Sequence, residues 1–99
     1  MTVLVSVITP TYNCGRFIGD TIESVQNQTH ENWEMIIVDD QSTDNTREIV
    51  SRYMENDQRI TYVQLEENSG AAIARTKAME LANGKYMAFL DSDDLWTPD

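Results

Sequence analysis

Four apolar runs rich in β-branched residues are spaced along the chain, and each predicts a β-strand. The runs are residues 3–9, 33–38, 60–65 and 86–90. The segments between them repeat apolar residues at the 3.6-residue period of amphipathic helices. The predicted helices are residues 16–28, a second helix with the stripe Ile49, Val50, Tyr53 and Met54, and residues 71–82. We expect the third strand nearer a sheet edge, the fourth strand buried, and Gly84 in the left-handed position that ends the third helix.

The predicted order of elements is therefore β-α-β-α-β-α-β, with short connections. Such alternation builds an α/β, Rossmann-like three-layer fold, in which right-handed crossovers place helices on both faces of a mainly parallel sheet. Ligands of such folds bind beyond the carboxyl ends of the strands. The polar segments that follow the four strands should therefore converge on one edge. They are Pro10–Asn13, Asp39–Asp40, Asn68–Gly70 and Asp91–Asp94.

Composition narrows the class of protein and of partner. Ninety-nine residues suffice for one small domain, and 40% hydrophobic with 24% charged residues are ordinary globular proportions. The formal net charge of −10 argues against nucleic acid and anionic membrane surfaces as partners, because both need a basic patch. The one cysteine, Cys14, cannot form an internal disulfide, which favours a reducing, cytoplasmic setting; we interpret it as incidental. The sequence has neither the basic start of a signal peptide nor an apolar run of 18 residues.

The segment Asp91-Ser92-Asp93-Asp94 carries three carboxylates directly after the fourth predicted strand. Two carboxylates about 4 to 5 Å apart repel by roughly 3 to 4 kcal/mol at an effective dielectric constant near 20. Hard divalent cations such as Mg²⁺ or Mn²⁺ take oxygen ligands of this kind, often together with substrate phosphates. Taken alone, the cluster fits a metal site and an acidic turn or helix N-cap equally well.

The same predicted edge offers the parts of a nucleoside-diphosphate site. Tyr12 could stack on a base, a carboxylate of the pair Asp39-Asp40 could accept an imide N–H, and Arg75 with a divalent ion could neutralise the phosphates. Each part has a second interpretation: Tyr12 as an aromatic residue of the rim, Asp40 as a cap of the second helix, and Arg75 as a solvated charge. Asp39 is the more structural of the acidic pair. Neither G-x-G-x-x-G after the first strand nor G-x-x-x-x-G-K-[ST] occurs, which disfavours dinucleotide dehydrogenases and P-loop enzymes.

Four motifs, in order, resemble those of family 2 glycosyltransferases, which are inverting enzymes of the GT-A type. The motifs are Val7–Asn13 (VITPTYN), Ile37–Asp44 (IVDDQSTD), Asn68-x-Gly70 with Ala74-Arg75, and Phe89–Pro98 (FLDSDDLWTP). The resemblance covers essentially all 99 residues. Gln41 is a mild departure, since the family often has glycine or asparagine there.

For the base, the resemblance implies three contacts. Pro10 contacts the nucleotide through its backbone, Tyr12 lies against the uracil, and Asp40 accepts the imide N–H. Because thymine and guanine also offer an N–H to an aspartate, UDP is the default by resemblance alone.

For the rest of the donor, the resemblance implies that Arg75 approaches the nucleotide and that Asp91 and Ser92 lie near the ribose. Asp93, together with Asp91, is assigned to a Mn²⁺ or Mg²⁺ ion that bridges the diphosphate. Asp94 belongs to the following turn and is outside the metal set.

The activity implied is metal-dependent transfer of a sugar, with inversion, from a nucleotide-diphosphate sugar to an acceptor hydroxyl. In this family the catalytic base and the pocket for a saccharide or lipid-linked acceptor lie beyond the D-x-D motif. We therefore expect residues 1–99 to be the donor-binding half of a longer GT-A domain and inactive alone. Sheet surface that the remainder would cover should expose apolar residues and permit self-association. The full-length protein would be cytoplasmic or peripheral at the inner face of the membrane.

Two other classes fit parts of the pattern. The strand followed by Asp91-Ser92-Asp93 also resembles the opening of haloacid-dehalogenase-type phosphatases, but there the motif usually stands on the first strand. A non-catalytic, receiver-like Mg²⁺-binding module would need its acidic pair after the first strand, which here ends in Thr9-Pro10. Both alternatives are therefore weaker than the glycosyltransferase.

Overall fold

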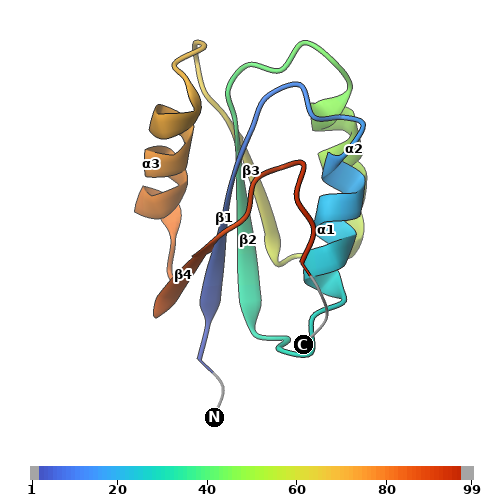
Figure 1. Cartoon of the computed structure of the whole chain (residues 1–99), viewed down its shortest axis with the longest axis vertical. Coiled ribbons are helices and arrows are strands. Elements are labelled where there is room, and N and C mark those ends of the chain that lie inside the picture. The colour runs from blue at the N-terminus through green and yellow to red at the C-terminus, as the bar shows by residue number, and fades with distance from the viewer. Residues whose placement is uncertain (1–2, 97–99) are drawn as a thin grey trace.

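A computed structural model describes residues 3–96 as three layers around a four-stranded parallel sheet. The strands lie in the order β3-β2-β1-β4, with α1 and α2 on one face and α3 on the other (Figure 1). The elements are β1 (Val5–Thr11), α1 (Ile18–Gln26), β2 (Trp33–Asp39), α2 (Thr46–Asn56), β3 (Ile60–Gln64), α3 (Ala71–Leu81) and β4 (Tyr86–Phe89). The predicted Rossmann-like architecture is confirmed. Among the described residues, no helix has the length and apolarity that a membrane span requires.

Two buried clusters follow from the two-residue period of the strands. Val7, Met35 and Ile37 point from the sheet toward α1 and α2, whereas Ile8 and Ile36 point toward α3. Each fully buried aliphatic side chain contributes about 1.5–3 kcal/mol. On the α3 side the helix contributes small residues, which allow it to approach the sheet closely. These residues are Ala74 and Ala78, both fully buried.

Strand β1 continues past its predicted end at Thr9, through Pro10 to Thr11. Thr11 directs its carbonyl to β2, where it accepts the N–H of Asp40 at 2.9 Å. Because successive residues of a strand face opposite neighbours, Pro10 faces β4 instead. The pairing of β1 with β4 ends at Ile8, so the missing N–H of Pro10 interrupts no ladder. The prediction that the proline bounds the strand was wrong for this reason.

The prediction that the fourth strand is buried was also wrong. β4 is an edge strand, and its side chains are exposed: Tyr86 by 56% and Phe89 by 55%. β3 forms the other edge, as predicted. The apolar composition of β4 resembles that of an interior strand, but no other described element pairs with its outer edge. An apolar strip is therefore open to solvent along this side of the molecule.

Gly84 does not occupy the left-handed region, which corrects a third prediction. Among the described residues, positive φ angles occur at Asn13 (50°), Gln41 (64°) and Gly70 (96°). A Cβ atom at Gly84 would instead lie 2.6 Å from Ser6 Oγ and 2.7 Å from Ser6 N. Glycine is required there because the turn before β4 passes directly against β1.

Candidate donor-binding site

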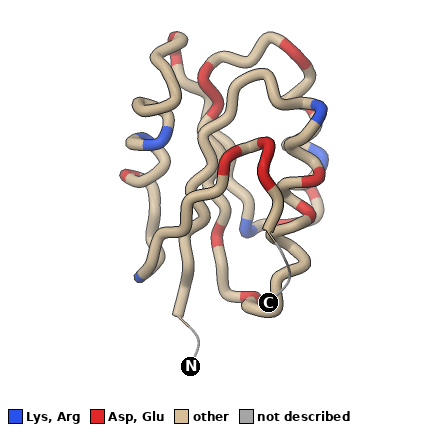
Figure 2. Tube along the Cα trace, viewed as in Figure 1, with Lys and Arg blue, Asp and Glu red and all other residues tan. Residues whose placement is uncertain are grey.

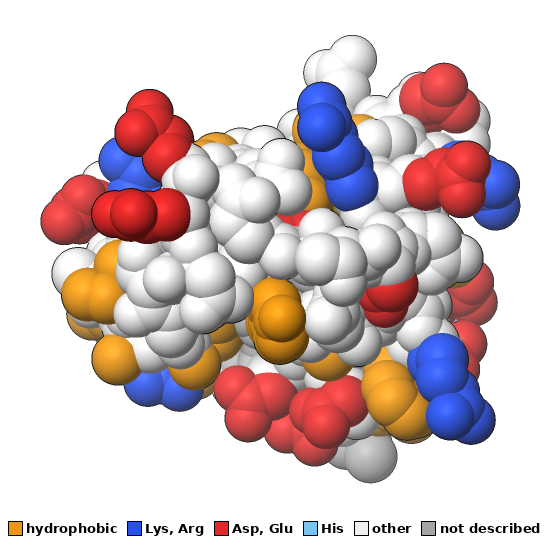
Figure 3. Space-filling model, turned by 90° about the horizontal axis from the view of Figure 1, so that it is seen from above, with side chains coloured by type: hydrophobic (Ala, Val, Ile, Leu, Met, Phe, Trp, Pro, Cys, Tyr) orange, Lys and Arg blue, Asp and Glu red, His pale blue; other side chains and the backbone are white. Residues whose placement is uncertain are grey.

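The four polar segments that follow the strands meet at the carboxyl edge of the sheet. They enclose an open cavity of about 480 Å³, within the range of small-molecule sites. Figure 3 looks onto this end of the molecule from above and shows acidic groups around its rim. The lining includes every residue predicted to bind the nucleotide or the metal. The lining residues are Pro10, Thr11, Tyr12, Cys14, Asp40, Asn68, Ala71, Ala74, Arg75, Asp91, Ser92 and Asp93.

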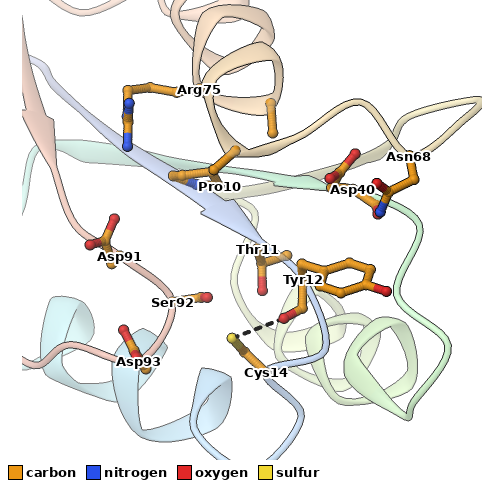
Figure 4. Close-up of a pocket in the computed structure, with 12 residues that line it drawn as sticks. Pro10, Thr11, Tyr12, Cys14, Asp40, Asn68, Arg75, Asp91, Ser92 and Asp93 are labelled. Carbon is orange, nitrogen blue, oxygen red and sulfur yellow. Dashed lines mark hydrogen bonds between the residues drawn. The ribbon is translucent and has the colours of Figure 1, made fainter.

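The pocket has two chemically different sides. Tyr12 and Asp40 lie on one side, and the loop with Asp91 and Asp93 lies on the other (Figure 4). Arg75 projects from α3 near the acidic side. The first side offers an aromatic ring and hydrogen-bond acceptors, which suit a base. The second side combines a cation with carboxylates, which suit a phosphate and a metal ion together.

The loop after β4, which carries red segments in Figure 2, holds Asp91, Asp93 and Asp94. The side chains of all three are exposed. One oxygen from each carboxylate lies within 4.8 Å of the others. Two oxygens on one Mg²⁺ or Mn²⁺ ion lie at most about 4.2 Å apart, since each bond measures about 2.1 Å. Exposed side chains can close this difference, so the all-oxygen set fits a hard divalent cation. Asp94 donates its N–H to Asp91 O at 3.0 Å, which is the predicted turn, but its carboxylate joins the same cluster.

The carboxylate of Asp40 organises the loop before α3. Its two oxygens accept the backbone N–H groups of Ser69, at 2.6 Å, and Gly70, at 2.8 Å. The backbone carbonyl of Asp40 accepts a hydrogen bond from Asn68 Nδ2 at 2.9 Å. The interpretation of Asp40 as a cap of the second helix was wrong, because these contacts lie at the start of the third. Each carboxylate oxygen can accept a further hydrogen bond. Asp40 is 5% exposed and borders the pocket, which makes it a candidate acceptor for a ligand bound there.

Asp39 is structural, as the sequence indicated. It is fully buried, and it accepts hydrogen bonds from the N–H and the hydroxyl of Ser42 at 2.8 and 2.6 Å and from the hydroxyl of Tyr62. Burial and the hydrogen bond to this carboxylate raise the pKa of Tyr62. Asp39 therefore ties the end of β2 to β3 and does not enter the pocket.

Tyr12 is 49% exposed, and its ring borders the pocket from the loop after β1. Asn13, which follows it, fastens this loop to the loop after β2. The backbone N–H of Asn13 donates to Ser42 Oγ at 2.8 Å, and Asn13 Oδ1 accepts the N–H of Thr43 at 2.7 Å. From the sequence, Asn13 is expected only to be part of the motif that contains Tyr12. The sequence feature that could have indicated this role is an asparagine in a predicted turn, because asparagine tolerates the left-handed conformation observed at this position.

Arg75 is half-buried on α3 and borders the pocket beside Pro10 and Asp91. Neither of the two ion pairs found among residues 3–96 involves it. Its guanidinium therefore has no carboxylate partner among the described residues, and its place in the pocket lining makes it available to an anionic ligand. Cys14, interpreted as incidental, also borders the pocket, and its thiol donates to Tyr12 O at 3.3 Å.

Comparison with known proteins identifies the family. The model of glycosyl transferase family 2 matches residues 6–99. The chain belongs to this family. It is 62% identical to TuaG of Bacillus subtilis, named for teichuronic acid biosynthesis, over 97% of this chain and 38% of that protein. It is 47% identical to the Escherichia coli protein WfgD, named a UDP-Glc:alpha-D-GlcNAc-diphosphoundecaprenol beta-1,3-glucosyltransferase, over 94% of this chain and 36% of that one. The chain thus spans little more than a third of these relatives.

Solved structures show the same fold. Staphylococcus aureus TarS 1-349 in complex with UDP superposes with a TM-score of 0.90 at 37% identity, covering 96% of this chain and 29% of that one. The Pyrobaculum calidifontis mannosyltransferase PcManGT, in complex with GDP-Man and Mn²⁺, superposes with a TM-score of 0.86 at 33% identity, covering 93% and 28%. The four-stranded sheet and its helices are therefore a GT-A-type fold. Pro98, the last motif position, lies outside the described residues.

Proposed function

We infer that this chain is the donor-binding half of a glycosyltransferase and that its donor is a UDP-sugar. The observation that carries the proposal is the pocket itself, where the Tyr12 ring and the Asp40 carboxylate lie across one cavity from Asp91 and Asp93, with Arg75 near the latter two. UDP or UDP-GlcNAc is the ligand of the TarS complexes, and WfgD is named for UDP-Glc. GDP-Man is the ligand of PcManGT, so a guanine donor is the alternative to be tested.

On the base side, Tyr12 stacks on the uracil, Asp40 accepts its imide N–H, and Pro10 contacts the nucleotide through its backbone. Stacking on an aromatic ring suits any base, whereas the acceptor selects for an N–H at the right place. The bonds from Ser69 and Gly70 support this role because they fix the orientation of the Asp40 carboxylate before the ligand arrives. Such preorganisation lowers the cost of ordering the site on binding.

On the phosphate side, Asp91 and Ser92 lie near the ribose, while Asp93 and Asp91 hold Mn²⁺ or Mg²⁺. When bound, the ion supplies Lewis-acid stabilisation of the charge that develops on the leaving diphosphate. Arg75 adds a fixed positive charge to the same group. The positive charges of the ion and of Arg75 would offset the net charge of −10, which would otherwise repel an anionic donor.

The reaction we propose is direct displacement with inversion. The acceptor oxygen attacks the anomeric carbon, the bond from that carbon to the diphosphate breaks, and the acceptor proton passes to a carboxylate base. We place this base, and the pocket for a saccharide or lipid-linked acceptor, in a part of the protein beyond residue 99. The 99-residue chain would then bind the donor without turning it over, and its exposed β4 would favour self-association. We propose a cytoplasmic protein, peripheral at the inner membrane face if its acceptor is lipid-linked.

A nucleotide titration followed by ¹H–¹⁵N NMR tests the donor assignment. The titration uses Mg²⁺, because paramagnetic Mn²⁺ would broaden the signals. UDP should shift the amide signals of Tyr12, Asp40 and Arg75, and GDP should shift them less. Tyr12→Ala should reduce UDP affinity by about tenfold, the worth of one stacked base. Lys77→Ala, on the same helix as Arg75 but absent from the pocket lining, is the control. Equal affinity for UDP and GDP would overturn the uracil assignment.

A further inference from the structure

The acidic loop is attached to α1 by a buried threonine that the sequence motifs do not include. Thr21 lies on the core-facing side of α1 and is fully buried. Its Oγ1 lies 2.9 Å from Ser92 O and 2.8 Å from Asp94 O, and 3.2 Å from Phe17 O in its own helix. The two loop carbonyls flank Asp93, the predicted metal ligand. Among the residues that the structure describes, Thr21 is the only hydrogen-bond donor to either of them.

A second attachment stands one helical turn further along α1. Ser24 Oγ accepts the backbone N–H of Trp96 at 3.1 Å and donates to Thr21 O at 2.7 Å. Residues three apart lie on the same face of a helix, so both hydroxyls point toward one segment of chain. The loop after β4 accordingly runs alongside α1 (Figure 1). Its two attachments enclose the stretch that carries Asp93 and Asp94.

We propose that Thr21 is a positioning residue for the metal-binding loop, an inference that rests on the proposed function. It touches no ligand itself; it fixes the backbone on both sides of Asp93 and thereby sets where the carboxylates of the cluster point. The hydroxyl is needed because it is the donor that both loop carbonyls face, and they lie closer to it than the carbonyl of Phe17, the third acceptor within reach, at 3.2 Å in its own helix. Valine has the same shape but no donor, so it would remove this hydrogen-bond donor from both loop carbonyls and release the loop.

The first measurement is the affinity of the chain for Mn²⁺ with UDP present, read from the electron paramagnetic resonance signal of free Mn²⁺. Partners that orient metal ligands typically change metal affinity by 10- to 100-fold when they are removed. We expect Thr21→Val to weaken Mn²⁺ binding at least tenfold and Thr21→Ser, which keeps the hydroxyl, to stay within about threefold of wild type.

The matched control is Thr76→Val. Thr76 is also a helical threonine, and its Oγ1 donates to Ala72 O at 3.0 Å, but it is exposed and bonds no loop. It should bind Mn²⁺ like wild type. Thermal unfolding is recorded for each variant, and affinities are compared only well below the transition. Should Thr21→Val not fold, Ser24→Ala removes the second attachment at a less buried position and is expected to weaken Mn²⁺ binding about threefold.

A metal-free measurement separates this inference from the proposed function. Amide hydrogen exchange of Asp94 should be at least tenfold faster in Thr21→Val than in wild type, while the exchange of Ile22 and Val7 in the core is unchanged. If wild type binds no Mn²⁺, the metal assignment is overturned, and faster exchange at Asp94 alone still supports Thr21 as the anchor of the loop. Wild-type exchange and wild-type Mn²⁺ affinity in Thr21→Val would overturn the inference.

Discussion

Replacing Gly70 by alanine separates backbone strain from steric contact in the loop that holds Asp40. Gly70 has φ 96° and ψ 160°, a combination that is open to glycine and costly for any L-residue with a side chain. An ideal Cβ at this position would meet no atom within 4 Å. Any loss of stability must therefore come from the backbone angles and not from crowding.

The magnitude follows from two opposing contributions. Holding an alanine in this region costs roughly 1–3 kcal/mol. Alanine also restricts the unfolded chain more than glycine does, which offsets about 0.4–1 kcal/mol. The net loss in the free energy of unfolding should be about 1–2 kcal/mol. If the loop instead relaxes to spare the strain, the Gly70 N–H moves away from Asp40, and UDP affinity should fall while stability is retained.

Urea denaturation and a UDP titration of the same samples measure both effects. The control is D-alanine at position 70, introduced by chemical synthesis, because a D-residue favours positive φ. It should match or exceed the stability of wild type. If Gly70→Ala leaves both stability and UDP affinity unchanged, or if D-alanine is as harmful as L-alanine, the conformational argument is refuted.

Three further changes test other parts of the structure. Asn13→Ala removes the acceptor for the Thr43 N–H and loosens the loop that carries Tyr12. UDP binding should therefore weaken about five- to tenfold in a titration, and unchanged affinity would contradict the proposed stacking of Tyr12 on the base. Gly84→Ala should lower the free energy of unfolding by more than 2 kcal/mol in urea, because its Cβ would lie 2.7 Å from a backbone nitrogen; a milder effect than at Gly70 would count against the close-approach argument. Asp57 has its pKa lowered to about 2 by its hydrogen bond with Arg59, so its contribution is present above pH 4 and lost as the pH falls through 2. In Asp57→Asn the acid-induced loss of stability between pH 4 and 2 should be smaller by about 1 kcal/mol, since the partner side chain is partly exposed and solvent screens the pair.

The order and type of the elements could be predicted from the sequence because each segment had a clear period and a clear boundary. The position of β4 at the edge of the sheet could not be predicted in this way. Its residues, such as Tyr86 and Phe89, are as apolar as those of an interior strand, and periodicity reports composition, not which neighbours a strand finds. Gly84 was misjudged for a related reason. A glycine after a helix usually supplies a positive φ, whereas here it makes room for β1, a contact between segments 78 residues apart.

The residues of the pocket could be predicted because the fold rule places them at one edge, but their supports could not. Asp40 bonds a loop 29 residues away, and Thr21 bonds a loop 71 residues away. The visible signal for Thr21 was a hydroxyl on the apolar face of its helix, between Ile18 and Val25. A buried polar group in such a position needs a partner, yet the sequence does not say which one.

The measurement that most directly tests the donor-site assignment is calorimetric titration of UDP with and without Mn²⁺, on wild type and Asp93→Ala. We predict that Mn²⁺ strengthens UDP binding at least tenfold in wild type and has no such effect in Asp93→Ala. Glu67→Ala, which removes an exposed carboxylate outside the pocket lining, should behave like wild type. UDP binding that does not depend on Mn²⁺, or an Asp93→Ala variant that responds to Mn²⁺ like wild type, would contradict the metal-bridged donor site.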